Sequence, residues 1–188
     1  MSNLTGQKVS QTYGRLVQIV SGDYYDGLGN SIDIRKNSDF YWGSFYDTTT
    51  QTNPGATYAN VMTFNTTDIS NGITIEDSSK LTFQHTGVYN IQFSAQFDKT
   101  DAGSDDVEVW LRKNGNNVSD SSTLVTLIGN NARTVAAWNF FVTANSGDYF
   151  QLVWHSNDVD LRILARIAQS NPQRPAIPSI ILTAHRVS

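Results

Sequence analysis

The segment TGVYNIQFSAQF, residues 86–97, alternates between apolar and polar side chains over its whole length. This period of two predicts a β-strand with one face in a protein core. The opposite face is unusual, because it carries amides and a hydroxyl but no Lys or Glu, which suggests a surface that is covered. The apolar positions are Tyr89, Ile91, Phe93, Ala95 and Phe97, and the polar positions are Asn90, Gln92, Ser94 and Gln96.

Composition narrows the class of protein. A chain of 188 residues fits one domain of ordinary size with a short appendage. Charged residues make up only 16%, below the roughly 25% that is typical, and the net charge of −4 gives no reason to expect nucleic-acid binding. The absence of cysteine excludes thiol catalysis and disulfides. No signal peptide and no long apolar segment is evident, so we expect synthesis in the cytoplasm and no membrane contact.

Short alternating or β-branched segments recur along the chain, and helical periodicity is nearly absent. Turn signals such as Asn71-Gly72 and Asn114-Gly115 separate them. Many short strands in one domain predict an all-β sandwich, barrel or jelly roll. Strands are expected at residues 15–20, 39–46, 57–65, 73–76, 80–83, 87–98, 107–113, 118–128, 133–144, 148–155, 161–167 and 179–187.

The first 35 residues differ from the rest. They offer at most two strands and a Gly-rich loop, SGDYYDGLGN, and cannot bury a core of their own. We expect an extended arm at residues 1–35 and a β domain at residues 36–188. A further exception is SNPQRPAIPS, residues 170–179, whose three prolines predict a polyproline-like connector before the last strand.

Candidate catalytic and metal-binding residues are sparse. The histidines at 85, 155 and 185 have no partners at metal-ligand spacing, and no Gly-x-Ser-x-Gly elbow occurs. Two acidic stretches could supply oxygen ligands for calcium, but neither has EF-hand spacing. The sequence therefore predicts a protein that is not an enzyme and has no metal site and no cofactor. The acidic stretches contain Asp23 and Asp26, and Asp101, Asp105 and Asp106.

Aromatic residues point to a covered surface. In DVEVWLRKNG, Trp110 shares its face with charged residues, and in RTVAAWNFFVTA both faces are apolar. A sheet with one wet side needs only one apolar face, so a second surface must be covered by a loop or by another subunit. We favour a subunit interface, where aromatic residues are enriched and charges depleted.

The order of these segments resembles the tumour necrosis factor/complement globular-head family over roughly residues 38–188. The resemblance implies a jelly-roll β-sandwich that forms a homotrimer with aromatic residues along the subunit seam. The amide-rich face of residues 86–97 would then be packed in the trimer. The motif residues are Gly87, Tyr89 and Phe93; Leu111, Lys113, Asn114 and Gly115; and Gly147 and Asp148. The expected trimer contacts are Trp110, Trp138, Phe141, Tyr149 and Tyr89.

Two features depart from the animal members of that family, namely the missing signal peptide and the missing Gly-x-y stalk. Cysteine-free versions without a signal resemble the jelly-roll domains of tailed-bacteriophage virion proteins. This resemblance implies a non-enzymatic virion protein, made in the host cytoplasm, whose partner is the major capsid protein or another virion protein. Residues expected to anchor the arm to the virion are Lys8, Tyr13, Arg15, Tyr24 and Tyr25.

Two functions remain open at this point. The first is a trimeric capsid decoration, or cement, protein that stabilises the shell, which the short chain favours. The second is a fibre or tail head that recognises a host surface glycan, with Tyr46 and Tyr58 stacking on sugar rings. Both would use the same fold and arm, and a fold alone does not decide between them.

Overall fold

The computed structural model describes residues 18–21, 23–26, 29–32 and 40–188. The chain divides into two compact units, Met1–Asp39 and Phe40–Ser188. The boundary expected from the sequence was four residues earlier, after residue 35. No helix long and apolar enough to cross a membrane occurs among the described residues.

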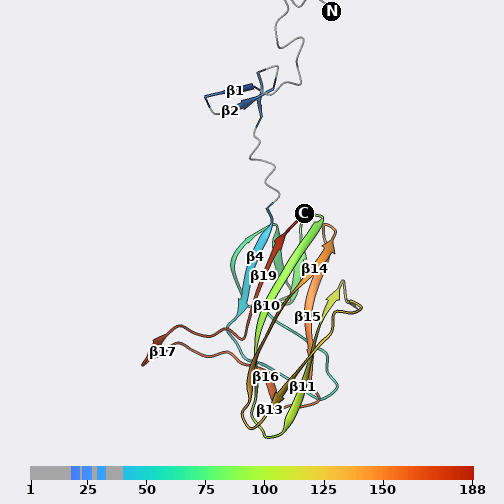
Figure 1. Ribbon diagram of the computed structural model, residues 1–188, viewed down its shortest axis with the longest axis vertical. Helices are drawn as coiled ribbons and strands as arrows, with labels where there is room; N and C mark the ends of the chain where they lie inside the picture. The colour runs from blue at the N-terminus through green and yellow to red at the C-terminus, as the bar shows by residue number, and fades with distance from the viewer. Residues whose placement is uncertain (1–17, 22, 27–28, 33–39) are drawn as a thin grey trace, which may run out of the picture. The chain divides into compact units, whose positions relative to one another are not determined.

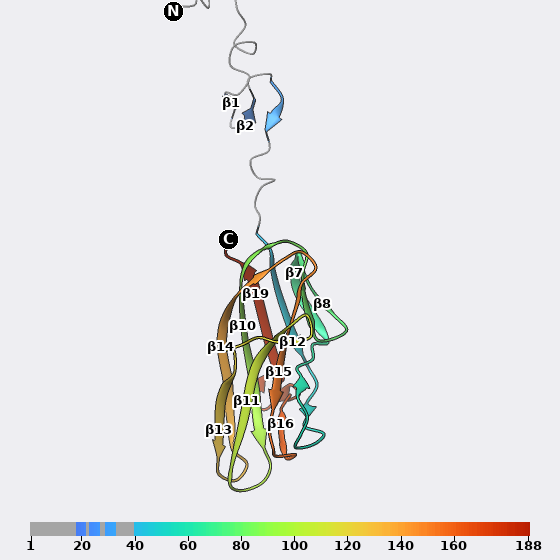
Figure 2. The same cartoon turned by 90° about the vertical axis from the view of Figure 1, so that its right-hand side faces the viewer.

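The second unit is a sandwich of two antiparallel sheets, which Figures 1 and 2 show from two sides. The first sheet has the order β7 (Thr66–Asn71), β4 (Trp42–Asp47), β19 (Ile180–Arg186), β10 (Gly87–Lys99) and β14 (Arg133–Ala144). The short strand β16 (Leu161–Ile163) pairs with the last residues of β10, and β5 (Gln51–Thr52) pairs with β16. The second sheet has the order β8 (Ile73–Glu76), β9 (Lys80–Phe83), β15 (Tyr149–His155), β11 (Ser104–Lys113) and β13 (Thr123–Ile128), with the short strands β6 (Asn60–Val61) and β12 (Asn116–Asn117) at its margins.

This strand order defines a jelly roll. The eight main strands along the chain are β4, β9, β10, β11, β13, β14, β15 and β19. Numbered one to eight, they form sheets of order 1-8-3-6 and 2-7-4-5. Each sheet thus joins strands from both ends of the chain, as two intertwined Greek keys require. The all-β jelly roll expected from the sequence is confirmed.

Strand β10 organises the core as its alternation predicts. Its side chains from Tyr89 to Phe97 at every second position are at most 4% exposed and pack between the two sheets. Aromatic contacts extend from it to both layers, since Phe93 meets Trp138 at 4.7 Å and Phe97 meets Trp154 at 5.7 Å between ring centroids. Burial of side chains of this size contributes about 1.5–3 kcal/mol each, so this strand is the main apolar anchor of the first sheet.

Three local expectations are corrected. The first unit has three short strands, where at most two were expected: β1 (Gln18–Val20), β2 (Asp23–Tyr25) and β3 (Ser31–Ile32). Residues 57–65 contain only the two-residue strand β6, and the unpredicted β7 follows as an exposed edge strand. The proline-rich segment is not a polyproline connector, because β17 (Gln169–Ser170) and β18 (Gln173–Arg174) pair as a hairpin. Its turn is Asn171-Pro172, where a proline needs no hydrogen-bond donor.

Two motifs distant in the sequence meet at one end of the second sheet. Asn114 and Tyr149 exchange hydrogen bonds, with Asn114 N donating to Tyr149 O at 3.0 Å and Tyr149 N donating to Asn114 Oδ1 at 2.9 Å. Asp148 accepts hydrogen bonds from Asn114 Nδ2 at 2.7 Å and from Asn145 N at 2.8 Å, and Lys113 Nζ lies 2.8 Å from its carboxylate. The Lys-Asn-Gly and Gly-Asp motifs therefore have a structural role, which is to join two turns.

These contacts make the stability of the fold depend on pH. The hydrogen bond from Lys113, followed by those from Asn145 and Asn114, lowers the pKa of Asp148 to about 2. A lowered pKa stabilises the fold above pH 3.8, and this stabilisation is lost as the pH falls toward 2. We expect Asp148→Asn to reduce the free energy of unfolding by about 1–2 kcal/mol at pH 7 and to change it little at pH 2. Urea unfolding at both pH values measures this, and Asp77→Asn, in an exposed ion pair, is the control.

Candidate functional site

The outer face of the first sheet is the most unusual surface of the second unit. Cross-strand pairing sets its residues in three rows that run from β14 through β10, β19 and β4 to β7. None of these side chains is Asp, Glu, Lys or Arg, although all face away from the core. We call this surface the uncharged face. Its rows are Phe141, Asn90, His185, Trp42 and Asn71; Asn139, Gln92, Thr183, Ser44 and Ile69; and Ala137, Ser94, Ile181, Tyr46 and Thr66.

Apolar side chains gather at the two margins of the uncharged face. At the β14 margin, Phe141 is 65% exposed, and Val135, one row beyond the face, is 54% exposed. At the opposite margin, Ile69 on β7 is 56% exposed and Trp42 on β4 is 38% exposed. Between them lie Ile181, which is 40% exposed, and several amides and hydroxyls. Some of these are already paired, such as Asn139 Nδ2 donating to Asn90 Oδ1 at 3.1 Å. Exposed aromatic and aliphatic groups without charges are the composition of an interface core.

The outer face of the second sheet has the opposite character. Strand β11 presents Asp106, Glu108 and Arg112 there, and Asp106 accepts a hydrogen bond from Thr126 Oγ1 at 2.6 Å. Charges of both signs on neighbouring positions are what a solvated sheet face carries. The sandwich thus has one outer face without charges and one on which charges of both signs lie beside the exposed Leu124 and Ile128.

The five aromatic residues predicted at a trimer contact lie on different surfaces. Phe141 is on the uncharged face, and Trp138 is half-buried at the open edge of the core. Trp110, whose indole donates to Asn117 Oδ1 at 2.9 Å, and Tyr149 lie on the outer face of the second sheet. Tyr89 is wrong as a contact residue, because it is 0% exposed in the core and donates its hydroxyl to His85 O at 2.7 Å. Its place in the apolar phase of residues 86–97 already indicated this burial.

The other predicted site residues are also separated. Tyr46 belongs to the uncharged face, whereas Tyr58 is 56% exposed in a loop whose carbonyl contacts His155 of the second sheet. The two tyrosines therefore do not form one stacking platform for a sugar. Tyr24 and Tyr25 lie in strand β2 of the first unit. Lys8, Tyr13 and Arg15 lie outside the described residues.

Charged side chains occur next to the uncharged face, at the end of β10 that pairs with β16. Asp98 is 1% exposed, and its carboxylate lies 2.5 Å from Arg133 Nε and 2.7 Å from Arg162 Nη2. These three residues form one row across β14, β10 and β16. Two guanidinium groups on one carboxylate leave a positive excess, so the uncharged face ends at a small cationic border.

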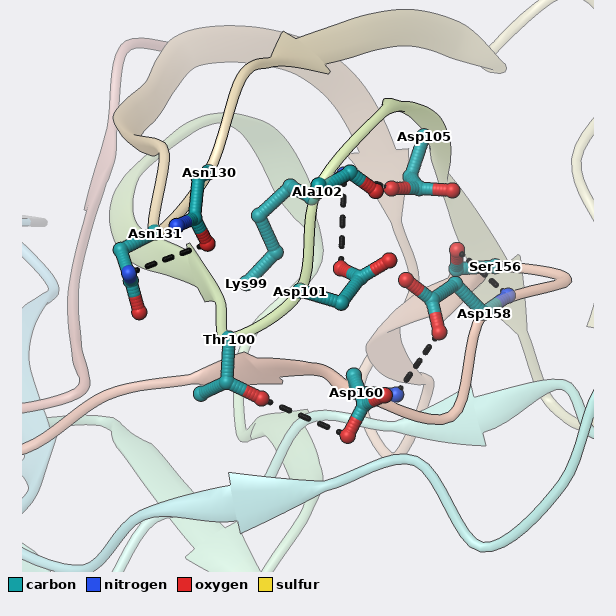
Figure 3. Close-up of polar contacts among 10 residues, drawn as sticks. All are labelled: Lys99, Thr100, Asp101, Ala102, Asp105, Asn130, Asn131, Ser156, Asp158 and Asp160. Atoms are coloured by element: carbon teal, nitrogen blue, oxygen red, sulfur yellow. Dashed lines mark hydrogen bonds and ion pairs between the residues drawn. The ribbon is translucent and has the colours of Figure 1, made fainter.

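Beyond this border, carboxylates surround a buried lysine, as Figure 3 shows. The side chain of Lys99 is 0% exposed, and its ammonium pairs with Asp105 and lies 3.4 Å from Asp101. The hydrogen bond to Asp105 raises the pKa of Lys99. From another loop, Asp158 and Asp160 approach Asp101, and the ligand atoms of these three carboxylates lie within 4.8 Å of one another.

This acidic cluster has the donor type that a hard cation prefers. Burial raises the pKa of Asp158, and the charges of nearby carboxylates add to this effect. The negative charge of the cluster is therefore not fully offset by nearby cations. The sequence grouped Asp101 with Asp105 and Asp106, whereas the structure groups it with residues almost 60 positions later. The order of the strands brings these loops together, and no spacing motif could have shown it.

Comparison with known proteins assigns no family to the chain. No family model matches the chain, and no curated protein does. Among solved structures, that of murine APRIL at pH 8.5 is 8% identical with a TM-score of 0.49, and 79% of this chain covers 100% of it. The globular domain of zebrafish complement 1qA protein is 13% identical with a TM-score of 0.46, and 79% of this chain covers 98% of it. At such values the assignment as a jelly roll rests on the strand order itself.

Proposed function

We propose that this chain is a homotrimeric, non-enzymatic binding and structural module whose subunits meet through the uncharged face. The observation that carries the proposal is the composition of that face, which has no Asp, Glu, Lys or Arg among three rows of outward side chains. Burying amides and hydroxyls costs little when they find hydrogen-bond partners, whereas each buried charge would cost several kcal/mol.

The two margins of the face explain why the assembly is cyclic. Phe141 and Val135 form one apolar patch at β14, and Ile69 and Trp42 form a different one at β7 and β4. A contact between two different patches repeats around an axis, and it closes into a ring when the rotation between neighbours is an exact fraction of a full turn. Three subunits are the number that the resemblance to trimeric jelly rolls implies.

Light scattering of the intact chain tests this proposal. We expect one species of three times the subunit mass of 20.8 kDa, stable on dilution through the micromolar range. A mass of 20.8 kDa at high micromolar concentration would contradict the proposal, because the uncharged face would then be exposed to water.

We further propose that the trimer is a virion structural protein of a tailed bacteriophage that decorates and stabilises the capsid shell. Its support is the build of the chain, in which one jelly-roll head follows a separate small unit that contains Tyr24 and Tyr25. That unit would contact the major capsid protein by strand addition, where backbone hydrogen bonds provide affinity. Immunogold labelling of purified particles should place the protein over the whole head.

The second candidate is a fibre head that binds a host glycan, and the exposure of the Tyr58 ring favours it. Tyr46 would be covered in the trimer, so Tyr58 would be the aromatic residue left to stack on a sugar. Label confined to tails or sparse fibres would select this alternative, and Tyr58→Ala should then abolish cell binding. Unlabelled particles would contradict both virion functions and leave the trimeric module.

A further inference from the structure

The segment between β16 and β19 projects from the sandwich as a two-stranded arm, residues 164–178. Figures 1 and 2 agree that it leaves on the side of the first sheet and points away from the second. The bridge between Arg166 and Ile177 closes its base, with reciprocal backbone hydrogen bonds of 2.8 Å, and β17 and β18 form its outer part. Within residues 40–188, no further strand pairs with β17 or β18.

Such an arm is poorly stable when water surrounds it. An isolated two-stranded ribbon is marginal in water, because it buries little apolar surface. Residues 166–173 are all exposed, and Ile167 is 86% exposed, the largest value among the exposed large hydrophobic residues of the described chain. Arg174 holds the ribbon together through bonds to Ile167 O and Pro175 O at 3.2 and 3.0 Å. The chain thus maintains an extended shape whose outer surface lacks a partner within the subunit.

The base of the arm and the first sheet enclose a hollow of about 390 Å³. Val135 from the sheet and Leu164 and Ile177 from the arm supply its outward apolar side chains, and its lining also includes Asp98, Arg133 and Arg166. It directly continues the β14 margin of the uncharged face, since Val135 belongs to both. Any copy of the chain that packs on this face must therefore meet the arm and the hollow.

Charge also favours a second copy as the partner. The only charged residues of the arm are Arg166 and Arg174, and no acidic residue follows Asp160 in the sequence. Asp158 and Asp160 of the acidic cluster immediately precede β16, the strand that leads to the arm. Copies in a ring stand at the same height around the axis, so the arm of one reaches the level of its neighbour's acidic loops.

We propose that the arm is a clasp, which closes over the neighbouring subunit so that apolar groups of that copy fill the hollow. This inference rests on the proposed trimer and adds a second contact to it. The clasp extends the contact beyond the uncharged face. It joins the arm of one subunit to the acidic loops of its neighbour, which a contact between the sheets alone would not reach.

Shortening the arm tests the clasp. Replacing residues 167–176 by Asn-Gly turns the Arg166–Ile177 bridge into a two-residue hairpin, so the sandwich retains its connection. We expect the shortened protein to remain folded by circular dichroism and its trimer to dissociate at a concentration at least tenfold higher than the intact chain. Ile167→Lys should have a similar but smaller effect. Ile128→Lys, which changes a 77% exposed residue on β13, is the matched control and should have none.

Cross-linking gives a direct readout. The chain has no cysteine, so Ile167→Cys provides a single attachment point for a benzophenone label. Illumination should join two chains, and mass spectrometry should find the label on the first sheet or on the acidic loops. A trimer whose stability is unchanged by shortening, with labels only within one chain, overturns the clasp and leaves the trimer standing. A monomeric intact chain overturns both.

Discussion

Gln92→Glu is expected to convert the trimer into a monomer at micromolar concentration, although it changes only an amide to a carboxylate. Gln92 lies in the middle row of the uncharged face and is exposed in the isolated subunit. The variant subunit should therefore fold as before. In the assembly, three carboxylates would enter a surface without any cation among its three rows. Since an unpaired buried charge costs several kcal/mol, the trimer dissociation constant should rise at least 100-fold.

Analytical ultracentrifugation over a dilution series measures this change. Gln84→Glu, at an exposed position in the turn before β10, is the isosteric control and should leave the trimer intact. A second matched pair separates the face from exposure alone: Phe141→Lys, 65% exposed on β14, should dissociate the trimer, whereas Leu124→Lys, 57% exposed on β13, should not. Equal behaviour of the two variants in either pair would contradict an interface on the uncharged face.

Lys99→Met is expected to produce the largest loss of stability within the subunit. The ammonium of Lys99 is fully buried beside Asp101 and Asp105, and Asp158 and Asp160 lie close to Asp101. Removing one partner of a buried ion pair is far more harmful than removing both, because the remaining charges stay in place. At pH 7 the melting temperature should fall by roughly 10 °C.

The pH dependence of this variant separates lost charge from lost packing. Without the ammonium, the carboxylates repel one another, and protonation of Asp158, whose pKa is raised by burial, relieves the repulsion in acid. The difference between Lys99→Met and the unchanged protein should therefore shrink as the pH falls. Lys80→Met, which removes a surface ion pair with Asp77, should change the melting temperature by no more than about 2 °C. A constant difference at all pH values would show that the acidic cluster is not responsible.

The features predicted best from the sequence are those that depend on residues close together in the chain. The alternation of residues 86–97 indicated the core face of β10, and the motifs at residues 113–115 and 147–148 belong to the resemblance that implied a jelly roll. Strand β7 was missed because Thr66–Asn71 is an exposed edge without apolar alternation. The hairpin of β17 and β18 was missed because prolines suggest an extended connector, although Pro172 occupies the turn and Pro175 follows the second strand.

The candidate site was predictable only in part, because it comes from strands far apart in the chain. The amides of β10 signalled a covered surface, but Trp42, Ile69 and Ile181 join them only through cross-strand pairing. Tyr89 was assigned to the interface because it is aromatic, and the phase of its strand places it in the core. The low charge of residues 40–46 and 180–185 was the signal in the sequence that these segments share a face with β10.

The position of β19 in the first sheet has a consequence for synthesis. Residues Ile180–Arg186 are synthesised after the other strands of this sandwich, yet they lie between β4 and β10 and pair with both. Until they emerge, β4 and β10 keep open edges, and the residues that form the partner-binding surface remain in two separate halves. Closure over such long sequence separations is slow compared with local hairpin formation. A growing chain therefore cannot present the complete uncharged face to its neighbours until β19 has been synthesised.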